Sequence, residues 1–332
     1  MLRDQTFSAR PLIQGTNTAT RLLRLVNSGL YIATAALFVA FALTVPYFFS
    51  VENIFNILTA AAFKGILAAG FAIALIGGLI DTSMPGVIAV ASVLTGVLLQ
   101  QLGLPLPLTL LLVMMAGVLM GLFNGVMVVN ARINAFIATL ATGAVFFAIC
   151  IALTNGQTVV ITRPELQEAL LARPLGIPLV IWVLVACYVL GYLMLNHTKL
   201  GAHLYAVGAN YQAARLNGVP VERVIRIGLI IMAVLGTLTA ALATARGGQT
   251  LLYGTTLSGY DLADTLTAVL LGGVSLFGGT GKIERSLIAV LFLTILSNGL
   301  QFLGAPTGVW FVVRGVALVT AVILDVLRRR VV

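Results

Sequence analysis

The chain has 332 residues, of which 60% are hydrophobic and only 9% are charged, with a net charge of +9. A soluble domain normally carries about 25% charged residues. This composition therefore excludes an ordinary soluble enzyme, a disordered chain and a disulfide scaffold. Lipid is the solvent that accepts so much apolar surface. A transmembrane helix needs about 20 apolar residues, so the apolar share supplies about ten spans.

Ten apolar segments follow one another along the chain and predict an all-α polytopic membrane protein with a single membrane domain over residues 27–326. A basic tail, residues 1–26, precedes this domain, and a second basic tail, residues 327–332, follows it. The spans are expected at 27–45, 64–80, 86–102, 108–129, 134–153, 177–195, 227–245, 261–277, 287–303 and 309–326.

The distribution of basic residues predicts the orientation, because cytoplasmic loops of membrane proteins are enriched in Lys and Arg. With the N-terminus inside, most of the 19 basic residues fall in cytoplasmic segments. An even number of spans also returns the triplet Arg328–Arg330 to the inside, so both termini are expected in the cytoplasm. The net charge then reflects membrane topology and not nucleic-acid binding. Four basic residues are expected outside: Lys64, Arg163, Arg173 and Arg246.

Sites for covalent or nucleotide chemistry are missing from the sequence. The string most like a phosphate-binding loop, residues 276–283, has Leu276 in place of the first glycine and Ile283 in place of the hydroxyl residue. It is interpreted as a tight loop between two spans. His197 and His203 lie in one polar loop without a nearby carboxylate or thiol cluster. We therefore expect no catalytic residue, no metal ligand and no cofactor bound by this chain.

The longest polar segment, residues 196–226, is the most informative loop. Asn210 is a good N-cap, because its side chain can accept an orphan backbone N–H. Residues 211–217 are expected to form about two helical turns, which end at Gly218 and cannot continue through Pro220. Such a short capped helix fits the groove of another protein. It fits equally well on the membrane surface, and the residues alone do not separate the two interpretations.

Asp81 is the only acidic residue between Glu52 and Glu165. An ionisable group at membrane depth is costly and is by default a functional candidate. Glycines and a proline flank it and predict a helix break there. Asp81, Thr82 and Ser83 then cap the next helix, line the translocation path, or do both. Helix capping is the favoured interpretation.

Asn124 and Asn298 are each followed by glycine, in the fourth and ninth spans, which run in opposite directions. This parity suggests an inverted repeat of spans 2–5 and 7–10, an arrangement known in transporters. Asparagine within a span usually bonds a neighbouring helix, so helix packing is favoured over solute contact. Asp261 and Asp264 open the eighth span, where a negative charge complements the helix dipole.

Eight short strings in a fixed order carry a resemblance to a known family. They run from about residue 50 to residue 326, nearly the whole chain. The strings are ENIFNIL at 52–58, GGLID at 77–81, FIATL at 136–140, LTNGQ at 153–157, GAHLYAVGANYQAARLNG at 201–218, LGGVSLFGGTG at 271–281, SNGL at 297–300 and LD at 324–325. The set resembles the permease subunits of bacterial ABC importers, in the family of the ribose, xylose, arabinose and galactose permeases.

The chain departs from the family's pattern in two places. Thr82, Met84 and Pro85 stand where Leu, Val and Gly are usual, so a changed backbone is expected there. Glu284 and Arg285 stand where small residues are usual, and they are expected to pair locally or to touch a partner.

The resemblance implies a multi-pass subunit of the bacterial inner membrane. It would pair with a second permease, a copy or a paralogue, and with two cytoplasmic ATPase subunits that use ATP and Mg. An extracytoplasmic binding protein would deliver a monosaccharide or related polyol. The short helix of the polar loop would seat in a cleft of the ATPase, and this role passes to the residues that match the motif: Gly208, Asn210, Tyr211, Ala213, Ala214, Arg215 and Gly218.

Other functions compete with this interpretation. The second interpretation is a permease of the same architecture for a nucleoside, a sugar-like signal or a branched-chain amino acid. A secondary transporter driven by an ion gradient needs a coupling-ion site, for which Asp81 is the obvious candidate. Dependence of uptake on a partner ATPase, and not on an ion gradient, separates the importers from that class. An intramembrane enzyme would need a nucleophile and base, and the spans offer no such pair.

Overall fold

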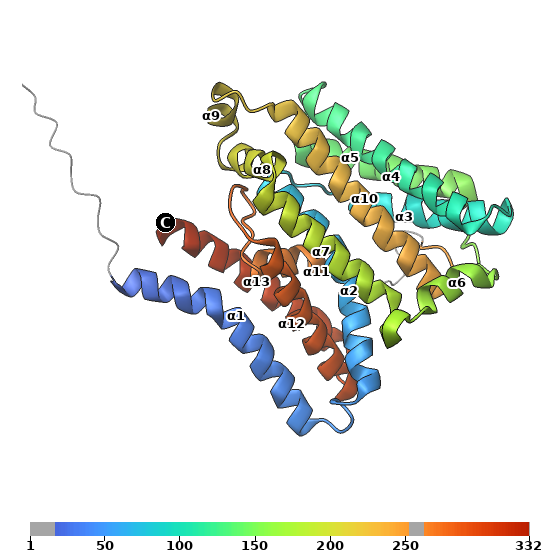
Figure 1. The fold of residues 1–332 in the computed structure, drawn as a ribbon, viewed down its shortest axis with the longest axis horizontal. Coiled ribbons are helices and arrows are strands. Elements are labelled where there is room, and N and C mark those ends of the chain that lie inside the picture. Colours follow the sequence, from blue (N-terminus) through green and yellow to red (C-terminus); the bar gives the residue numbers. More distant parts are fainter. Residues whose placement is uncertain (1–16, 252–261, 332) are drawn as a thin grey trace, which may run out of the picture.

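The computed structural model describes residues 17–251 and 262–331, and within these ranges the regular structure is helical (Figure 1). An isolated β-bridge between Val160 and Gln249 is the only strand-like pairing there. The long helices are α1 (Asn17–Thr44), α2 (Val51–Ile76), α3 (Met84–Gly96, continued by the π turn Val97–Gln101), α4 (Leu106–Val129), α5 (Ala135–Thr154), α7 (Leu179–His197), α10 (Val221–Gly247), α12 (Ile283–Phe302) and α13 (Thr307–Val331). The short ones are α6 (Pro164–Leu171), the 3-10 turn Pro174–Gly176, α8 (Lys199–Ala209), α9 (Tyr211–Leu216) and α11 (Leu262–Leu271).

Seven of the described helices are long and apolar enough to cross a membrane: α2, α3 with its π turn, α4, α5, α7, α10 and α12. Helices α1 and α13 contain shorter apolar segments, Gly29–Thr44 and Gly308–Ile323. The all-helical membrane architecture is thereby confirmed. The eighth span expected at 261–277 is wrong in its second half, because α11 ends at Leu271 and turns follow it. Its ten residues rise about 15 Å, half of the hydrocarbon core.

Helix α2 differs most from its expected span, 64–80. It begins at Val51, where the Ser50 hydroxyl oxygen accepts the Asn53 N–H at 3.2 Å, and it ends at Ile76. Its first half carries charged and amide side chains, and that polarity is typical of a loop. The structure continues the helix through this polar half: Asn53 bonds the Phe48 carbonyl oxygen and Asn298, and Glu52 and Asn56 are exposed.

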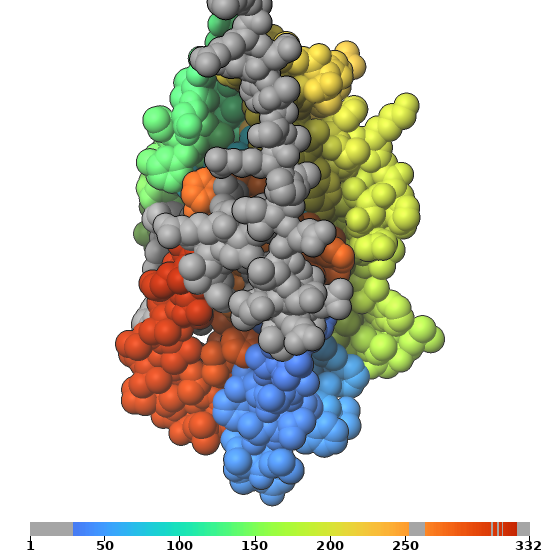
Figure 2. Space-filling model, turned by 90° about the vertical axis from the view of Figure 1, so that its left-hand side faces the viewer, coloured from blue at the N-terminus to red at the C-terminus, as the bar shows by residue number. Residues whose placement is uncertain are grey.

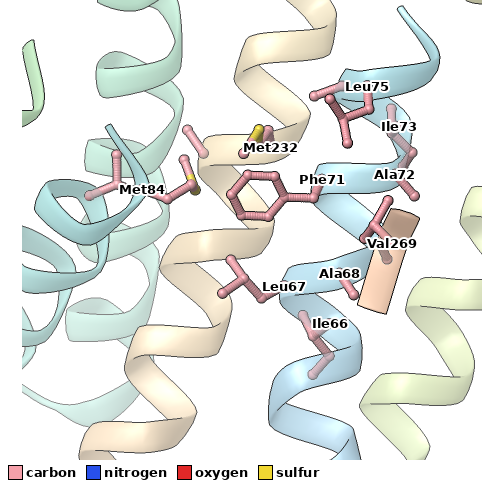
Figure 3. Close-up of a cluster of buried hydrophobic side chains, with 14 of the residues drawn as sticks. Ile66, Leu67, Ala68, Phe71, Ala72, Ile73, Leu75, Met84, Met232 and Val269 are labelled. Atoms are coloured by element: carbon pink, nitrogen blue, oxygen red, sulfur yellow. The ribbon is translucent and has the colours of Figure 1, made fainter. Parts of the chain in front are cut away.

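Helices α2 and α10 form the centre of the molecule. Both are apolar around most of their circumference, and the larger part of each is buried, which identifies central helices. Figure 3 shows Phe71 of α2 pointing toward Met232 of α10, with Met84 of α3 and Val269 of α11 on either side. The core therefore lies between these two helices and the shorter elements around them.

Helices α4, α5 and α7 form the outer wall. Only a minority of their apolar residues is buried, and large side chains such as Leu119, Ile137 and Leu190 are at least 60% exposed. Patches of this size on a soluble monomer are rare. They suit contact with hydrocarbon, in which the backbone groups of a helix need no outside partner.

Two ends of the molecule lie far apart. In Figure 1, α8 and α9 lie at the top and the turn between α1 and α2, residues 45–50, lies at the bottom. The space-filling view keeps this separation, with the gold segment of α9 above and the blue of the α1–α2 turn below (Figure 2). We call these the α9 end and the turn end. Helix α2 runs between them.

Candidate functional site

The α9 end carries the short capped helix that the sequence predicts. Asn210 separates α8 from α9, and its Oδ1 accepts the Ala213 N–H at 2.9 Å. Helix α9 ends at Leu216, and Gly218 adopts a φ of +78° two residues later. That φ lies in the left-handed region, which suits glycine. The predicted N-cap, length and C-terminal glycine are thereby confirmed.

The exposed face of α9 is apolar at its two ends. Leu216 is 89% exposed and Tyr211 is 42% exposed. Arg215 pairs with Glu222 at 3.5 Å in an exposed ion pair, and Ala213 is exposed as well. Ala214, by contrast, is buried in the core of this same chain. A partner protein that docks here would touch Tyr211 and Leu216, and substitution of Ala214 would disturb the chain itself.

Helix α8 joins this end to the centre of the molecule through backbone contacts. A Cβ on Gly208 would collide with the Ile76 carbonyl oxygen at the end of α2 and with the backbone nitrogen of Gly279. The Gly279 N–H in turn donates to the Ile76 oxygen at 2.9 Å. Gly208 therefore serves as a close-approach position, where three backbone segments meet with no side chain between them.

The loop between α11 and α12 is tied to α8 by a second bond. The Tyr205 hydroxyl donates to the Gly281 carbonyl oxygen at 2.9 Å. Burial raises the pKa of Tyr205, and the negative charge of Glu284 raises it further. The hydroxyl thus keeps its proton and donates. Gly278, Gly279 and Gly281 all have positive φ, so the interpretation of residues 276–283 as a tight loop is confirmed.

Asp81 lies in a buried hydrogen-bonded group that we call the closed cluster: Asp81, Ser83, Asn124, Thr139 and Thr142. The Oδ1 atom of Asp81 accepts the Ser83 N–H at 2.8 Å and the Ser83 hydroxyl at 2.6 Å. Asn124 Nδ2 donates to Ser83 Oγ at 2.8 Å and to Asp81 Oδ2 at 3.4 Å. The Thr142 hydroxyl completes the group by donating to Asn124 Oδ1 at 2.6 Å.

The closed cluster lies just before the start of α3, but the expected helix capping is wrong, because Ser83 at the N-cap position makes no side-chain cap hydrogen bond. Asp81 binds the residue that precedes α3, and Pro85 occupies the first turn of α3, a position that proline favours. The Thr82 N–H donates to Thr139 Oγ1 of α5 at 3.0 Å, and the Thr82 hydroxyl lies 3.1 Å from the same oxygen, which gives the unusual threonine side chain a partner. The predicted helix break at Asp81, Thr82 and Ser83 is confirmed. The three residues and Asn124 pack α3 against α4 and α5.

Asn298 also bonds a neighbouring helix. Its Nδ2 donates to Asn53 Oδ1 at 3.0 Å, and Asn53 Nδ2 donates back to Asn298 Oδ1 at 3.0 Å. Asn53 Nδ2 further donates to the Phe48 carbonyl oxygen at 2.8 Å. The helix-packing interpretation of Asn124 and Asn298 is therefore confirmed for both.

Lys64 lies in the middle of α2, so its expected place in an outer loop is wrong. Its Nζ is 3.6 Å from Asp264 Oδ2 in the first turn of α11, and the two side chains are 14% and 10% exposed. A charge at membrane depth is tolerated when a partner neutralises it. Asp264 thus pairs with a lysine in addition to sitting at a helix start. Asp261 lies outside the described residues.

An open hollow of about 640 Å³ lies at the turn end, between α2, α10 and α12. We call it the turn-end hollow. Sequence reasoning identified one of its residues, Asn298, and missed the others. A signal was present in the spacing of Glu52 and Asn56, which lie four residues apart on one face of α2. Its polar lining comes from Ser50, Glu52, Asn53, Asn56, Arg246, Asn298 and Gln301.

Comparison with known proteins gives the family. The model of the branched-chain amino acid transport system / permease component family matches residues 53–322. The ribose import permease protein RbsC of Escherichia coli K12 is 32% identical over 288 residues, 84% of this chain and 87% of that protein. The L-arabinose transport system permease protein AraH of the same strain is 35% identical over 303 residues, 90% and 89% of the two chains.

The likeness extends beyond one bacterium. The RbsC protein of Bacillus subtilis is 32% identical over 282 residues, which cover 84% of this chain and 86% of that protein. No solved structure matches the chain. The matched residues include the closed cluster, the α9 end and most of the lining of the turn-end hollow. The chain therefore belongs to the branched-chain amino acid transport system / permease component family.

Proposed function

We propose that the chain is the permease subunit of an ABC importer in the bacterial inner membrane. It would form the translocation path for a monosaccharide or related polyol that an extracytoplasmic binding protein delivers. The observation that carries this proposal is the likeness to ribose and arabinose import permeases over more than four fifths of each chain. ATP and Mg would be used by the partner ATPase, and this chain would bind no cofactor and no nucleic acid.

The proposed topology has ten spans with both termini in the cytoplasm. Helices α1 and α13 would add two spans to the seven long apolar helices, and α11 would enter the membrane as a half-length tenth segment. Lys199, Arg215, Arg223 and Arg226 gather on α8, α9 and the start of α10, which supports a cytoplasmic position for the α9 end. The turn end would then face outward.

Helix contacts support the proposed inverted repeat. The proposed repeat pairs α2 with α10, α3 with α11, α4 with α12 and α5 with α13. When each helix is replaced by its counterpart, the helix contacts of one unit become those of the other. Helix α4 packs on α10 as α12 packs on α2, and α3 packs on α5 as α11 packs on α13. The contact of α3 with α10 likewise corresponds to that of α11 with α2. Two such units would enclose a path between them.

The proposed partners are two ATPase subunits, a second permease copy or paralogue, and the binding protein. Helix α9 would dock in the ATPase through Tyr211 and Leu216, the apolar side chains that this chain leaves exposed. An ion-coupled transporter fits less well, because the oxygens of Asp81 already accept bonds from Ser83 and Asn124. A branched-chain amino acid is the second candidate solute, favoured by the description of the matching family.

Reconstitution tests the proposal. The chain is placed in vesicles together with the ATPase and binding protein that copurify with it from its native host, and ATP-dependent uptake of labelled D-ribose, L-arabinose and L-leucine is measured. We expect uptake of a sugar and none of leucine. Uptake of leucine alone would move the assignment to the second candidate. Uptake that follows an ion gradient in the absence of ATP would contradict an importer.

The docking of α9 has its own test. Leu216→Asp should abolish copurification of the ATPase, because it places an unpaired charge in an apolar contact, while the chain stays folded. Leu175→Asp is the matched control, since Leu175 is 88% exposed near α7 and away from the α9 end. Normal copurification with Leu216→Asp would show that α9 is not the docking element.

A further inference from the structure

The turn-end hollow offers unused hydrogen-bonding groups. Asn56 and Gln301 are exposed in it, and their amides make no side-chain hydrogen bond within the described residues. Each amide presents donors and an acceptor side by side, which matches hydroxyl groups that donate and accept in turn. Asn298 is held in place by its pair with Asn53, so its remaining N–H is fixed in direction. These groups are arranged to bind a solute rich in hydroxyl groups.

The charges around the hollow are balanced. One acid, Glu52, and one base, Arg246, line it. The Arg246 guanidinium lies 5.3 Å from the centre of the Phe63 ring, which holds the cation over an aromatic face. The lining therefore carries no net charge, and its overall field favours neither an anion nor a cation. This balance is compatible with a solute that carries no net charge.

The hollow leads along α2 to the buried ion pair. Ala60 lines the hollow, and Lys64 follows one turn deeper on the same face, about 6 Å farther along the axis. Its partner Asp264 lines a second, narrow cavity between α11, α12 and α13, together with Thr267 and Ser297. Polar side chains thus continue along α2 from the turn end toward the interior, and the Lys64–Asp264 pair lies one turn beyond the hollow.

The geometry points to a solute site in the turn-end hollow. It takes a neutral polyhydroxylated solute, with Asn56, Gln301 and Asn298 as specificity-determining residues and the Lys64–Asp264 pair as its inner boundary. The volume of about 640 Å³ is within the range of small-molecule sites. This assignment rests on the proposed function and deepens it. The closed cluster, whose groups bond one another, is excluded from the path.

Protection of introduced cysteines tests the site. Asn56→Cys, Gln301→Cys and the control Gln157→Cys, an exposed residue of the loop after α5, are made in a chain in which Cys150 and Cys187 are replaced by Ala. The assembled complex in right-side-out vesicles reacts with a membrane-impermeant thiol reagent, with and without 100 mM D-ribose or L-arabinose. We expect either sugar to slow labelling at positions 56 and 301 at least threefold and to leave the control unchanged.

Three results would overturn the assignment. The first is unchanged labelling with sugar, or equal slowing in the Gln157→Cys control. The second is equal protection by gluconate or glucosamine, which carry a charge, because it would contradict the neutral class. The third is protection by the sugar-free binding protein alone, because it would make the hollow a docking seat for that protein. Uptake of labelled sugar by the same vesicles reports separately whether the proposed function holds.

Discussion

The closed cluster and the turn-end hollow are both polar regions in an apolar protein, but they differ in whether their polar side chains bond one another. In the closed cluster, Asp81, Ser83 and Asn124 are buried and bond one another. In the hollow, Asn56 and Gln301 are exposed and bond no other side chain in the described part of the chain. Polar side chains that bond one another inside a membrane protein therefore stabilise the fold. Polar side chains that keep free donors and acceptors can instead bind a ligand.

Because of this difference, substitutions in the closed cluster should change stability, and substitutions in the hollow should change transport. Breaking a bond in the closed cluster leaves a buried polar group without a partner, so the folded state loses free energy. Removing an amide from the hollow leaves only water to replace it, so the fold should survive and the solute should bind less well. Substitutions in the two regions should consequently be distinguished by which measurement they change.

The largest effect is expected at the Lys64–Asp264 pair, which is largely buried like the closed cluster but lies one turn beyond the turn-end hollow. Asp264→Ala removes the carboxylate that lies 3.6 Å from the Lys64 amine, and removing one partner of a buried ion pair typically costs about 3–5 kcal/mol. The yield and the midpoint of thermal unfolding of the purified chain should fall sharply. The double variant Lys64→Met with Asp264→Leu should recover most of the stability. A stable single variant would show that the charges lie in water and not in the protein interior.

A matched pair of substitutions tests the comparison directly. Asn124→Leu removes the partner of Ser83 and Thr142, and we expect it to lower the free energy of unfolding by about 1–3 kcal/mol. Uptake per folded molecule should stay unchanged. Asn298→Leu, in the half-buried pair with Asn53, should lower stability less and reduce uptake. Thermal unfolding and sugar uptake are measured for both, and the reverse pattern would break the distinction between the two regions.

The smallest effect is expected at Gln301. Gln301→Ala removes one neutral hydrogen-bonding group, worth about 0.5–1.5 kcal/mol, so sugar uptake should fall about two- to tenfold. Gln157→Ala is the matched control outside the hollow, and its uptake should equal that of the unaltered chain. Identical uptake by both variants would remove Gln301 from the set of specificity-determining residues.

Local signals were sufficient to predict several parts of the molecule. Asn210 and Gly218 define the ends of α9 through bonds to residues within one or two turns. The glycines and proline around Asp81 likewise predict the helix break. These features depend on neighbours in the chain, so the sequence alone shows them.

Features that depend on distant partners were out of reach. Lys64 and Asp264 are 200 residues apart, and nothing near Lys64 shows that a carboxylate neutralises it. The polar first half of α2 was therefore taken for a loop. The orientation of α9 was hidden for the same reason, because Ala214 faces the chain's own core only when α8 and α10 are in place.

Helix α2 is one continuous rod of 26 residues, about 39 Å long. At one end its Ile76 oxygen binds Gly279 and touches Gly208, and at the other end Glu52 and Asn56 line the turn-end hollow. At this contact α8 and α2 meet backbone to backbone, with no side chain between them. If the proposed ATPase docks at the α9 end, α2 would carry a displacement of α8 as a rigid body to the turn-end hollow, because the helix is continuous between the two ends.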